Sequence, residues 1–289
     1  MLTYNGKILK YNGKWIQPYV PLPPLGTRHI RFQFSDTSYV PFASMTYGIR
    51  SASFEGTWTA VDASKGIWDW DVDDPQWSTD WSGKFWSKFS TGNGFSADET
   101  VKVLEADLTG IVNAKGLFYN SPLLVSADNF TNTGSLETIE IMFYGSGIVH
   151  APAFDTSSVL LMAQAFNSCT LLLDAPGYDL SSLSINTQYS QGSHGMMDMF
   201  GGCTALTAIP MFTNIPQADI YTCSSYFASA FYGCVNVESG ALDLYDAMID
   251  AGNLPSFNTN MFQNCGSNTV TGAAELAQIP ASWGGTLNV

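Results

Sequence analysis

A short motif that occurs six times in the second half of the chain constrains its fold more than any other feature. Each copy has a Phe, two further residues that are mostly small or polar, and then Cys or Ser. The six phenylalanines are separated by 25, 23, 34, 31 and 31 residues: Phe118, Phe143, Phe166, Phe200, Phe231 and Phe262. Periods of this size are typical of solenoid proteins, in which each repeat stacks on the next.

Each repeat unit carries the signals of one helical turn followed by one short strand. Residues 157–165, ahead of one Phe, begin with Ser residues that favour a helix start and continue with apolar residues at helical spacing. Asn and Gly after the Phe end that turn. Apolar runs such as 171–176 and 206–210 follow, each long enough for one strand that stops at Pro. One helical turn and one short strand in each repeat are typical of a leucine-rich-repeat solenoid, so we expect the repeated Phe and Cys to stack as internal ladders.

The cysteines follow the same repeat. Cys223 lies outside the pattern, but the other four occupy one repeat position: Cys169, Cys203, Cys234 and Cys265. The odd count argues against a disulfide framework, and the long spacings lack the close ligand pairs of zinc sites. We therefore expect small buried thiols that pack the solenoid core.

These residues resemble a known family. Residues 153–159, with Met162 and residues 165–169, are similar to the "PLFDTSSVTNMSxMFxxC" unit of the BspA-like leucine-rich-repeat family, the bacterial surface protein 26-residue repeat. Residues 199–210 are similar to its "MFxGCTSLTxxP" part, and 264–280 resemble a terminal region found in gut Bacteroidales and their phages or prophages. The resemblance covers about 100–289. It implies a surface-exposed recognition protein, either a bacterial adhesin or a phage virion protein.

The distribution of charge divides the chain and excludes some partners. All eleven Lys and Arg lie between Lys7 and Lys115, and the formal net charge is −14. An acidic chain without basic clusters cannot neutralise phosphates, which argues against nucleic acid. No apolar run approaches the ~20 residues of a membrane helix, and the amino terminus lacks the apolar segment of a secretory signal. We expect no membrane insertion and no ordinary export.

The first part of the chain is predicted to be β-rich. Residues 1–24 contain two Asn-Gly turns between short β-prone runs, which predict a small β-meander, and end in a Pro-rich linker. This unit either anchors the chain to another subunit or folds back. Residues 25–112 have alternating short runs typical of a sandwich. Residues 113–289 form the repeat region with a carboxy-terminal cap. The predicted fold class is therefore mainly β with short helices, a sandwich-like module followed by an irregular leucine-rich-repeat solenoid.

Five of the eight tryptophans fall within nineteen residues: Trp68, Trp70, Trp77, Trp81 and Trp86. One hypothesis is that they form a platform on which sugars stack. If 67–73 is a strand, its Trp residues share one face and its Asp residues the other, because side chains alternate along a strand. The alternative, which the pattern favours, is a sandwich strand with Trp inward and Asp outward.

The intervening carboxylates suggest the only candidate cofactor, Ca²⁺. They fall at positions 1, 3, 5 and 12 of an EF-hand-like register: Asp69, Asp71, Asp73 and Asp80. Position 6 of that register is Asp74 rather than the required Gly, and Pro75 follows it. The sequence therefore disfavours a true EF-hand and leaves an irregular calcium site as the alternative to binding no cofactor.

No constellation for catalysis is present, so we expect a protein that is not an enzyme. The three histidines lie in separate contexts: His29, His150 and His194. The sequence favours a bacteriophage virion protein of the tail or fibre, made in the host cytoplasm and mediating host attachment by non-covalent binding. It would be a homo-oligomer, contacting other virion proteins through its amino-terminal segment and a host-surface glycan or protein through the solenoid. The alternatives are a bacterial cell-surface adhesin, a purely structural virion component or a glycan hydrolase.

Overall fold

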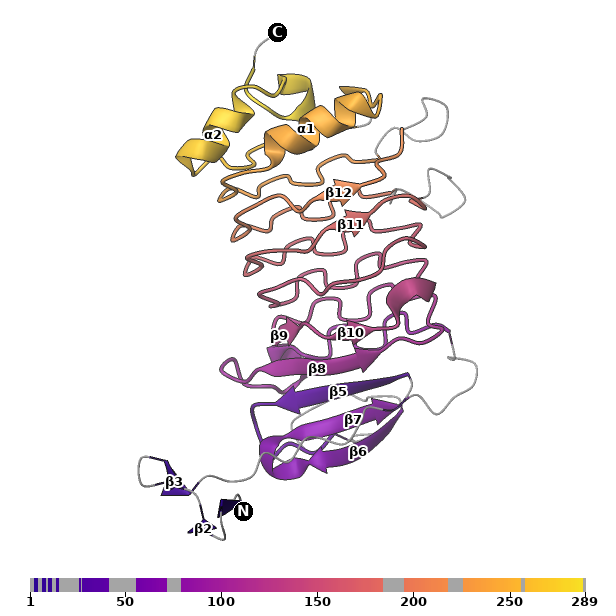
Figure 1. Cartoon of the computed structure of the whole chain (residues 1–289), viewed down its shortest axis with the longest axis vertical. Helices are drawn as coiled ribbons and strands as arrows, with labels where there is room; N and C mark the ends of the chain where they lie inside the picture. Colours follow the sequence, from indigo (N-terminus) through magenta and orange to yellow (C-terminus); the bar gives the residue numbers. More distant parts are fainter. Residues whose placement is uncertain are drawn as a thin grey trace.

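The computed structural model describes residues 3–4, 7–8, 10–11 and 14–15 as backbone, and residues 26, 28–41, 56–71, 79–183, 195–217, 226–255 and 258–287 in full. These residues form a mainly β structure that contains two α-helices, α1 and α2. Figure 1 shows successive turns of the chain stacked along the long axis, with the two helices at the carboxy-terminal end. No helix among the described residues is both long and apolar enough to span a membrane.

The two Asn-Gly pairs near the amino terminus are flanked by short paired strands, and the described strands form two separate pairs rather than one continuous meander. Strands β1 (Thr3–Tyr4) and β2 (Lys7–Ile8) pair antiparallel, with Tyr4 opposite Lys7. Strands β3 (Lys10–Tyr11) and β4 (Lys14–Trp15) pair in the same way. Asn-Gly favours this geometry because both residues tolerate the positive φ of a tight hairpin turn.

A six-stranded sheet follows, in the order β10-β8-β5-β7-β6, with β9 also paired to β8. The pairs β6-β7, β7-β5 and β5-β8 are antiparallel, whereas β8 pairs in parallel with β9 and β10. The strand bounds are β5 His29–Phe34, β6 Thr57–Asp62, β7 Ile67–Asp71, β8 Val101–Asp107, β9 Leu124–Ala127 and β10 Phe130–Thr131. Strand β8 therefore joins the antiparallel sheet to the stacked turns beyond it.

Within the described residues, the layer facing this sheet is a turn of the chain rather than the second sheet of a sandwich. Phe32 on β5 contacts Phe85 with ring centroids 5.0 Å apart. Trp70 on β7 contacts Phe85 at 4.9 Å and Trp81 at 5.3 Å, in both cases edge to face. Such edge-to-face contacts are favourable because the positive edge of one ring meets the negative face of the other. One continuous apolar core links the sheet to the stacked turns.

The stacked turns, which we call the coil stack (the described residues of 79–287), are joined by a repeating set of backbone hydrogen bonds. The N–H of Phe118 donates to the carbonyl of Met142 at 2.8 Å, and the N–H of Phe143 donates to the carbonyl of Ala165 at 2.8 Å. The N–H of Phe85 donates in the same way to Leu117 at 2.9 Å. The regular hydrogen bonding therefore includes a coil around Phe85, one turn earlier than the first motif found in the sequence.

The predicted Phe ladder is present in the core. Neighbouring rings stack with centroid distances of 5.4, 5.6, 5.3, 5.3 and 6.3 Å along the series Phe118, Phe143, Phe166, Phe200, Phe231 and Phe262. Phe85 extends the ladder, since its ring stacks on Phe118 at 5.5 Å. Because all these rings are buried, each coil covers the apolar face of its neighbour.

Each coil bends sharply at two residues with positive φ, placed two residues before and two residues after its Phe. The seven pairs are Gly83/Ser87, Gly116/Asn120, Ile141/Gly145, Gln164/Ser168, Asp198/Gly202, Ser229/Gly233 and Asn260/Asn264. The predicted helical turn is accordingly a series of hydrogen-bonded turns, because left-handed residues interrupt a helix. The predicted strands are also shorter than expected: they reduce to single bridges such as His150–Asp174 and to the parallel pair β11 (Tyr178–Asp179) and β12 (Phe212–Thr213).

The carboxy-terminal end is covered by α1 (Ala241–Asp250), α2 (Val270–Leu276) and a 3₁₀ turn at Ala281–Trp283. The carboxylate of Glu275 on α2 accepts hydrogen bonds from the first N–H groups of α1, including that of Ala241 at 2.8 Å. A negative group is favourable there because a helix amino terminus carries unsatisfied donors and partial positive charge. The N–H of Phe262 donates to the carbonyl of Trp283, so this cap also pairs with the last coil.

Candidate functional site

The described tryptophans of the cluster do not form a surface platform. Trp68, Trp70 and Trp81 are 8%, 0% and 0% exposed, so the core covers the rings that the platform hypothesis needs at the surface. Trp77 lies outside the described residues. Trp86 is 43% exposed and is the member of the cluster that the structure places at the surface. On β7 the inward Trp and partly exposed Asp alternate, which is the alternative that the pattern favoured.

The described carboxylates of the calcium hypothesis have different partners. Asp69 binds the buried guanidinium of Arg31 with two contacts of 2.6 and 2.8 Å. Asp71 lies 3.5 Å from the imidazole of His29. Asp80 accepts the N–H of Ser82 at 2.8 Å and so stabilises a turn of the first coil. Asp73 is not among the described residues, and within them no group of three or more His, Cys, Asp or Glu could hold a metal ion.

Trp86 instead begins an aromatic ladder on the outside of the coil stack. Its ring stacks on Tyr119 with centroids 4.0 Å apart and planes 22° apart. Tyr119 in turn stacks on Tyr144 at 5.0 Å and 18°. Each of these residues directly follows a Phe of the buried ladder, so inner and outer rings repeat together along the first three coils. We call Trp86, Tyr119 and Tyr144 the outer ladder.

Sequence analysis missed the two tyrosines of the outer ladder, although a signal for them was present. Each follows the repeated Phe, in Leu-Phe-Tyr and Met-Phe-Tyr, and Trp86 follows Phe85 in Lys-Phe-Trp. The repeat at Phe85 lacks the Cys or Ser three residues on, so the motif did not extend that far. Because the repeat at Phe85 was not recognised, nothing in the sequence indicated that Trp86 and Tyr119 occupy equivalent positions of neighbouring coils.

Gly116 makes room for the Trp86 ring. A Cβ atom at this position would lie 2.8 Å from Cε3 and Cζ3 of Trp86 and 3.6 Å from Cδ1 of Ile141. Real Cβ atoms do not approach a ring so closely, and Gly116 also has a φ of 61°, where a side chain adds strain. The indole therefore lies against the next coil, over the backbone of Gly116 and on the ring of Tyr119.

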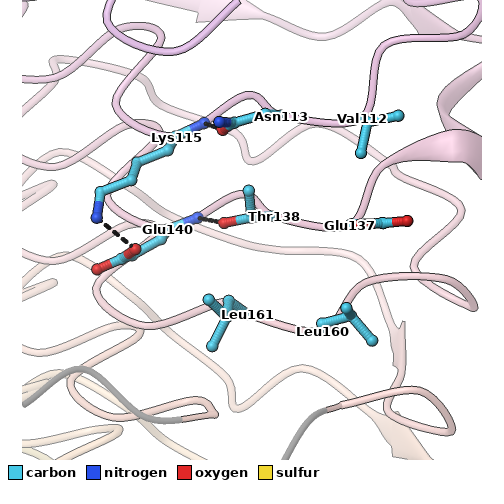
Figure 2. Close-up of a pocket in the computed structure, with 8 residues that line it drawn as sticks. All are labelled: Val112, Asn113, Lys115, Glu137, Thr138, Glu140, Leu160 and Leu161. Atoms are coloured by element: carbon cyan, nitrogen blue, oxygen red, sulfur yellow. Dashed lines mark hydrogen bonds and ion pairs between the residues drawn. The ribbon is translucent and has the colours of Figure 1, made fainter. Parts of the chain in front are cut away.

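A groove lies across the second, third and fourth coils of the stack, lined by residues at equivalent positions of these three coils. Its volume is about 270 Å³, and its lining is Val112, Asn113, Lys115, Glu137, Thr138, Glu140, Leu160 and Leu161. Figure 2 shows these side chains as rows, one row for each coil. Lys115 and Glu140 directly precede Gly116 and Ile141, which links the groove lining in sequence to the residues beneath Trp86.

The groove forms where the backbone ladder is irregular. The carbonyl of Val112 accepts from both Glu137 and Thr138, at 2.8 and 3.3 Å, and the carbonyl of Glu137 accepts from both Leu160 and Leu161 at the same two distances. Two donors facing one acceptor is the geometry of a β-bulge, which bends a strand and turns its side chains. Thr138 Oγ1 accepts the N–H of Glu140 at 3.2 Å and so stabilises the turn that follows.

One ion pair closes one side of the groove. Lys115 Nζ lies 2.7 Å from Glu140 Oε2, and the two side chains are 43% and 10% exposed. Glu137 is exposed on the opposite side in Figure 2. Lys115 is the last cation in the sequence, so the remaining coils carry only negative and neutral side chains.

The cysteine ladder is part of the core, as the sequence predicts, and has no reactive character. The four repeat cysteines are free and buried. Burial raises the pKa of both Cys169 and Cys234 from 9.0 to about 12, because a thiolate there would lose its hydration. Thiols of this kind are poor nucleophiles at neutral pH, since the thiolate is the reactive form.

Two histidines can be placed. His29 faces Asp71 across β5 and β7. His150 Nδ1 lies 2.8 Å from Asp174 Oδ2, and this pair is 53% and 62% exposed. His150 and Asp174 also form a bridge between successive coils, so their contact belongs to the regular stacking. His194 lies outside the described residues.

Comparisons with protein-family models, with curated proteins and with solved structures find no match to this chain. The resemblance to the BspA-like family, and the functions that it implies, therefore stay predictions from the motif residues.

Proposed function

We propose that this chain is a bacteriophage virion protein of the tail or fibre that attaches the particle to its host by non-covalent binding. The observation that carries the proposal is the outer ladder, a row of rings beside a groove on a rigid stack of coils, in which Trp86 is exposed and Tyr119 and Tyr144 are half-buried. Monomeric surfaces do not order aromatic side chains into such rows without a reason in packing or in binding, and exposed apolar patches mark interaction sites.

The coil stack would be an irregular solenoid of the BspA-like leucine-rich-repeat type. Residues that carry the resemblance occupy equivalent positions in successive coils: Phe166 stacks on Phe200 at 5.3 Å. Cys203 donates its thiol hydrogen to the carbonyl of Phe166 at 3.1 Å. A leucine-rich repeat requires that the repeated positions of its motif form the inner contacts of the stack, and these positions do so.

Rigidity supports a role in recognition. Every coil is held to the next by backbone hydrogen bonds and by a buried ring, so the outer residues are displayed in fixed positions. Binding to a preorganised surface costs less conformational entropy than binding to flexible loops. The protein would act by shape, hydrogen bonding and aromatic stacking, and would not be an enzyme.

The amino-terminal segment would join the chain to other virion proteins. Its two strand pairs, β1-β2 and β3-β4, are too small to be stable alone, because an isolated two-stranded hairpin is marginal in water. Contact with another subunit would supply the missing burial. The virion protein would assemble as a homo-oligomer in the host cytoplasm.

Mass spectrometry of purified phage particles from the source culture, with peptide-based copy numbers, tests this function. We expect the chain at a few to a few dozen copies per particle. Absence from particles, together with release from intact bacteria by surface proteolysis, would refute the virion role and establish the cell-surface adhesin instead.

A second measurement separates attachment from a purely structural virion role. Purified chain is added to host cells before the phage, and the rate of phage adsorption is measured. An attachment protein occupies the receptors and slows adsorption. An unchanged rate at saturating protein, for a chain that is present in the particle, would identify a structural component.

A further inference from the structure

We propose that the outer ladder is a carbohydrate-binding site in which a pyranose ring stacks on the free face of Trp86. This inference rests on the proposed function, which requires a surface receptor, and it names the class of receptor and the residues that bind it. It differs from the platform hypothesis raised by the sequence, because Trp68, Trp70 and Trp81 lie in the core.

The order of the rings identifies Trp86 as the stacking residue. Tyr119 lies between Trp86 and Tyr144, with planes within 22° and 18° of them, so both of its faces are covered. Trp86 is at the end of the ladder, and among the described residues Tyr119 is the one aromatic ring that it stacks on. Its side chain is nevertheless 43% exposed. A flat apolar face of this size matches the C–H face of a pyranose, which leaves the sugar hydroxyls at its edge for hydrogen bonds.

The Trp86 ring is also held in place before any ligand arrives. Tyr119 supports one face at a centroid distance of 4.0 Å, and the glycine at position 116 leaves space that any Cβ would fill. An exposed indole on a loop would lose rotamer freedom on binding, whereas this ring has already lost it. Preorganisation of an exposed aromatic side chain is the feature that distinguishes a binding surface from an incidental one.

Polar groups suited to sugar hydroxyls flank the rings. Ser87 directly follows Trp86, and Asn120 directly follows Tyr119. Asn120 is exposed, and its amide donates a long hydrogen bond of 3.3 Å to Ser87 Oγ. Both groups retain further donor and acceptor capacity, since an amide has four hydrogen-bonding positions and a hydroxyl three. One apolar face with a few polar groups at its rim is the usual composition of a small-ligand site.

The charges near the outer ladder admit neutral and acidic sugars alike. Lys84 and Lys88 lie within two residues of Trp86, and Lys115 precedes Gly116. Beyond Lys115 the sequence has no cation, so the later coils repel acidic sugars, whereas this end does not. Exposed charges farther away than about 8 Å are largely screened at physiological salt, so the net charge of −14 does not by itself exclude an acidic sugar at Trp86.

Tyr232 provides a matched control. It also directly follows a repeated Phe, and its side chain is 44% exposed against 43% for Trp86. The residues at the equivalent position of the adjacent coils are Gly201 and Gln263, so Tyr232 belongs to no ladder. The site therefore predicts that Trp86→Ala and Tyr232→Ala, two truncations of equally exposed rings, differ in binding.

The experiment measures binding of the full, fluorescently labelled chain to immobilised oligosaccharides and to bacteria of the source culture, untreated, periodate-oxidised or proteinase-treated. We expect glycan binding that periodate abolishes and proteinase spares. Trp86→Ala should weaken it by about tenfold or more, which corresponds to about 1.4 kcal/mol. Tyr232→Ala should bind as the unchanged chain does, and Trp86→Phe, which keeps a ring in the ladder, should fall between.

Several results would overturn the inference. Binding to cells that survives periodate and is lost with proteinase identifies a protein receptor, and leaves the attachment function intact. Equal binding by Trp86→Ala and Tyr232→Ala would refute the assignment of the sugar-binding site to Trp86. If the unchanged chain binds no glycan and no cell, carbohydrate binding by this protein is refuted. If Trp86→Ala melts at a lower temperature than the unchanged chain, Trp86→Phe decides. Weaker binding by this variant, which keeps a ring in the ladder, supports the indole as the stacking surface, and binding equal to that of the unchanged chain overturns it. Copy number in particles decides the virion role separately.

Discussion

The thiol of Cys203 donates a hydrogen bond to the backbone carbonyl of Phe166, one coil earlier, at 3.1 Å. The same carbonyl accepts the N–H of Cys169 at 3.1 Å, so both of its lone pairs are used. Cys234 repeats the contact one coil later, with Phe200 at 3.0 Å. The cysteine ladder thus satisfies backbone acceptors in the core that would otherwise lack a second partner, in addition to filling space.

The stability of the coil stack should fall as the pH rises from 9 to about 12. Burial raises the pKa of Cys169 and Cys234 from 9.0 to about 12. As the pH rises, these thiols therefore ionise first in the unfolded chain, and ionisation stabilises the unfolded chain relative to the folded one. The stabilising effect is complete below pH 9 and is lost as the pH approaches the folded value. The melting temperature at pH 8 and pH 11 measures this loss. The double variant Cys169→Ala/Cys234→Ala should lose less between the two pH values, and an equal loss would contradict the assignment.

Phe166→Ala should destabilise the stack by about 3–5 kcal/mol, because it leaves a large cavity between two stacked rings. Phe166 lies 5.6 Å from the Phe143 ring and 5.3 Å from the Phe200 ring, and it is fully buried. Urea denaturation monitored by circular dichroism measures the change. Tyr232→Ala, which removes an exposed ring after an equivalent Phe, should change stability by less than about 0.5 kcal/mol. Similar losses in both variants would contradict a core role for the ladder.

Asn260→Ile should cost about 1–2 kcal/mol although the side chain is exposed, because Asn260 has a φ of 58°. A β-branched side chain clashes with its own backbone in this region, whereas Asn tolerates it. Asn260→Gly is the control and should be nearly neutral, since Gly adopts positive φ freely. Thermal melts of the two variants measure the difference. If Asn260→Ile has the same melting temperature as Asn260→Gly, the bend at this position is not left-handed.

Asp69→Asn should destabilise the sheet by about 3 kcal/mol, because it leaves the buried Arg31 guanidinium without its bidentate partner. Arg31 is 2% exposed, and Glu105 lies 3.9 Å away, too far to replace two contacts of 2.6 and 2.8 Å. Asp62→Asn is the control: it breaks an equally short pair with Lys65, but in solvent, and should have little effect. Chemical denaturation compares the two. Equal effects would mean that burial adds nothing to the Arg31 pair.

Calcium should leave the melting temperature unchanged. Asp69 binds Arg31, and Asp71 lies near His29. Asp80 accepts a hydrogen bond from a backbone N–H. A cation that bound them would have to replace these partners, whereas a real site would stabilise the folded chain in proportion to the logarithm of calcium concentration. Melting curves in millimolar Ca²⁺ and in chelator measure the effect. A rise in melting temperature with Ca²⁺ would restore the calcium hypothesis.

The repeated motif was sufficient to predict the inner ladders, since stacking requires the same residue at the same place in every coil. It identified six phenylalanines and four buried cysteines, and the Asn-Gly pairs located both strand pairs, because these signals are local. It missed the coil around Phe85, where the Cys or Ser is absent. It also assigned helical turns to segments that bend twice, because residues such as Ile141 and Gln164 carry no sequence signal for positive φ.

Exposure of the aromatic side chains could not be predicted in the same way. Trp81 and Trp86 lie five residues apart and have similar neighbours in the sequence, yet one is buried against Trp70 and the other is 43% exposed. The direction of each ring depends on the left-handed bend at Gly83 between them and on the sheet that packs against the coil. The partner of Asp69 is likewise Arg31, 38 residues earlier. Local composition and period thus specify which residues repeat, whereas contacts between distant segments select the rings left at the surface.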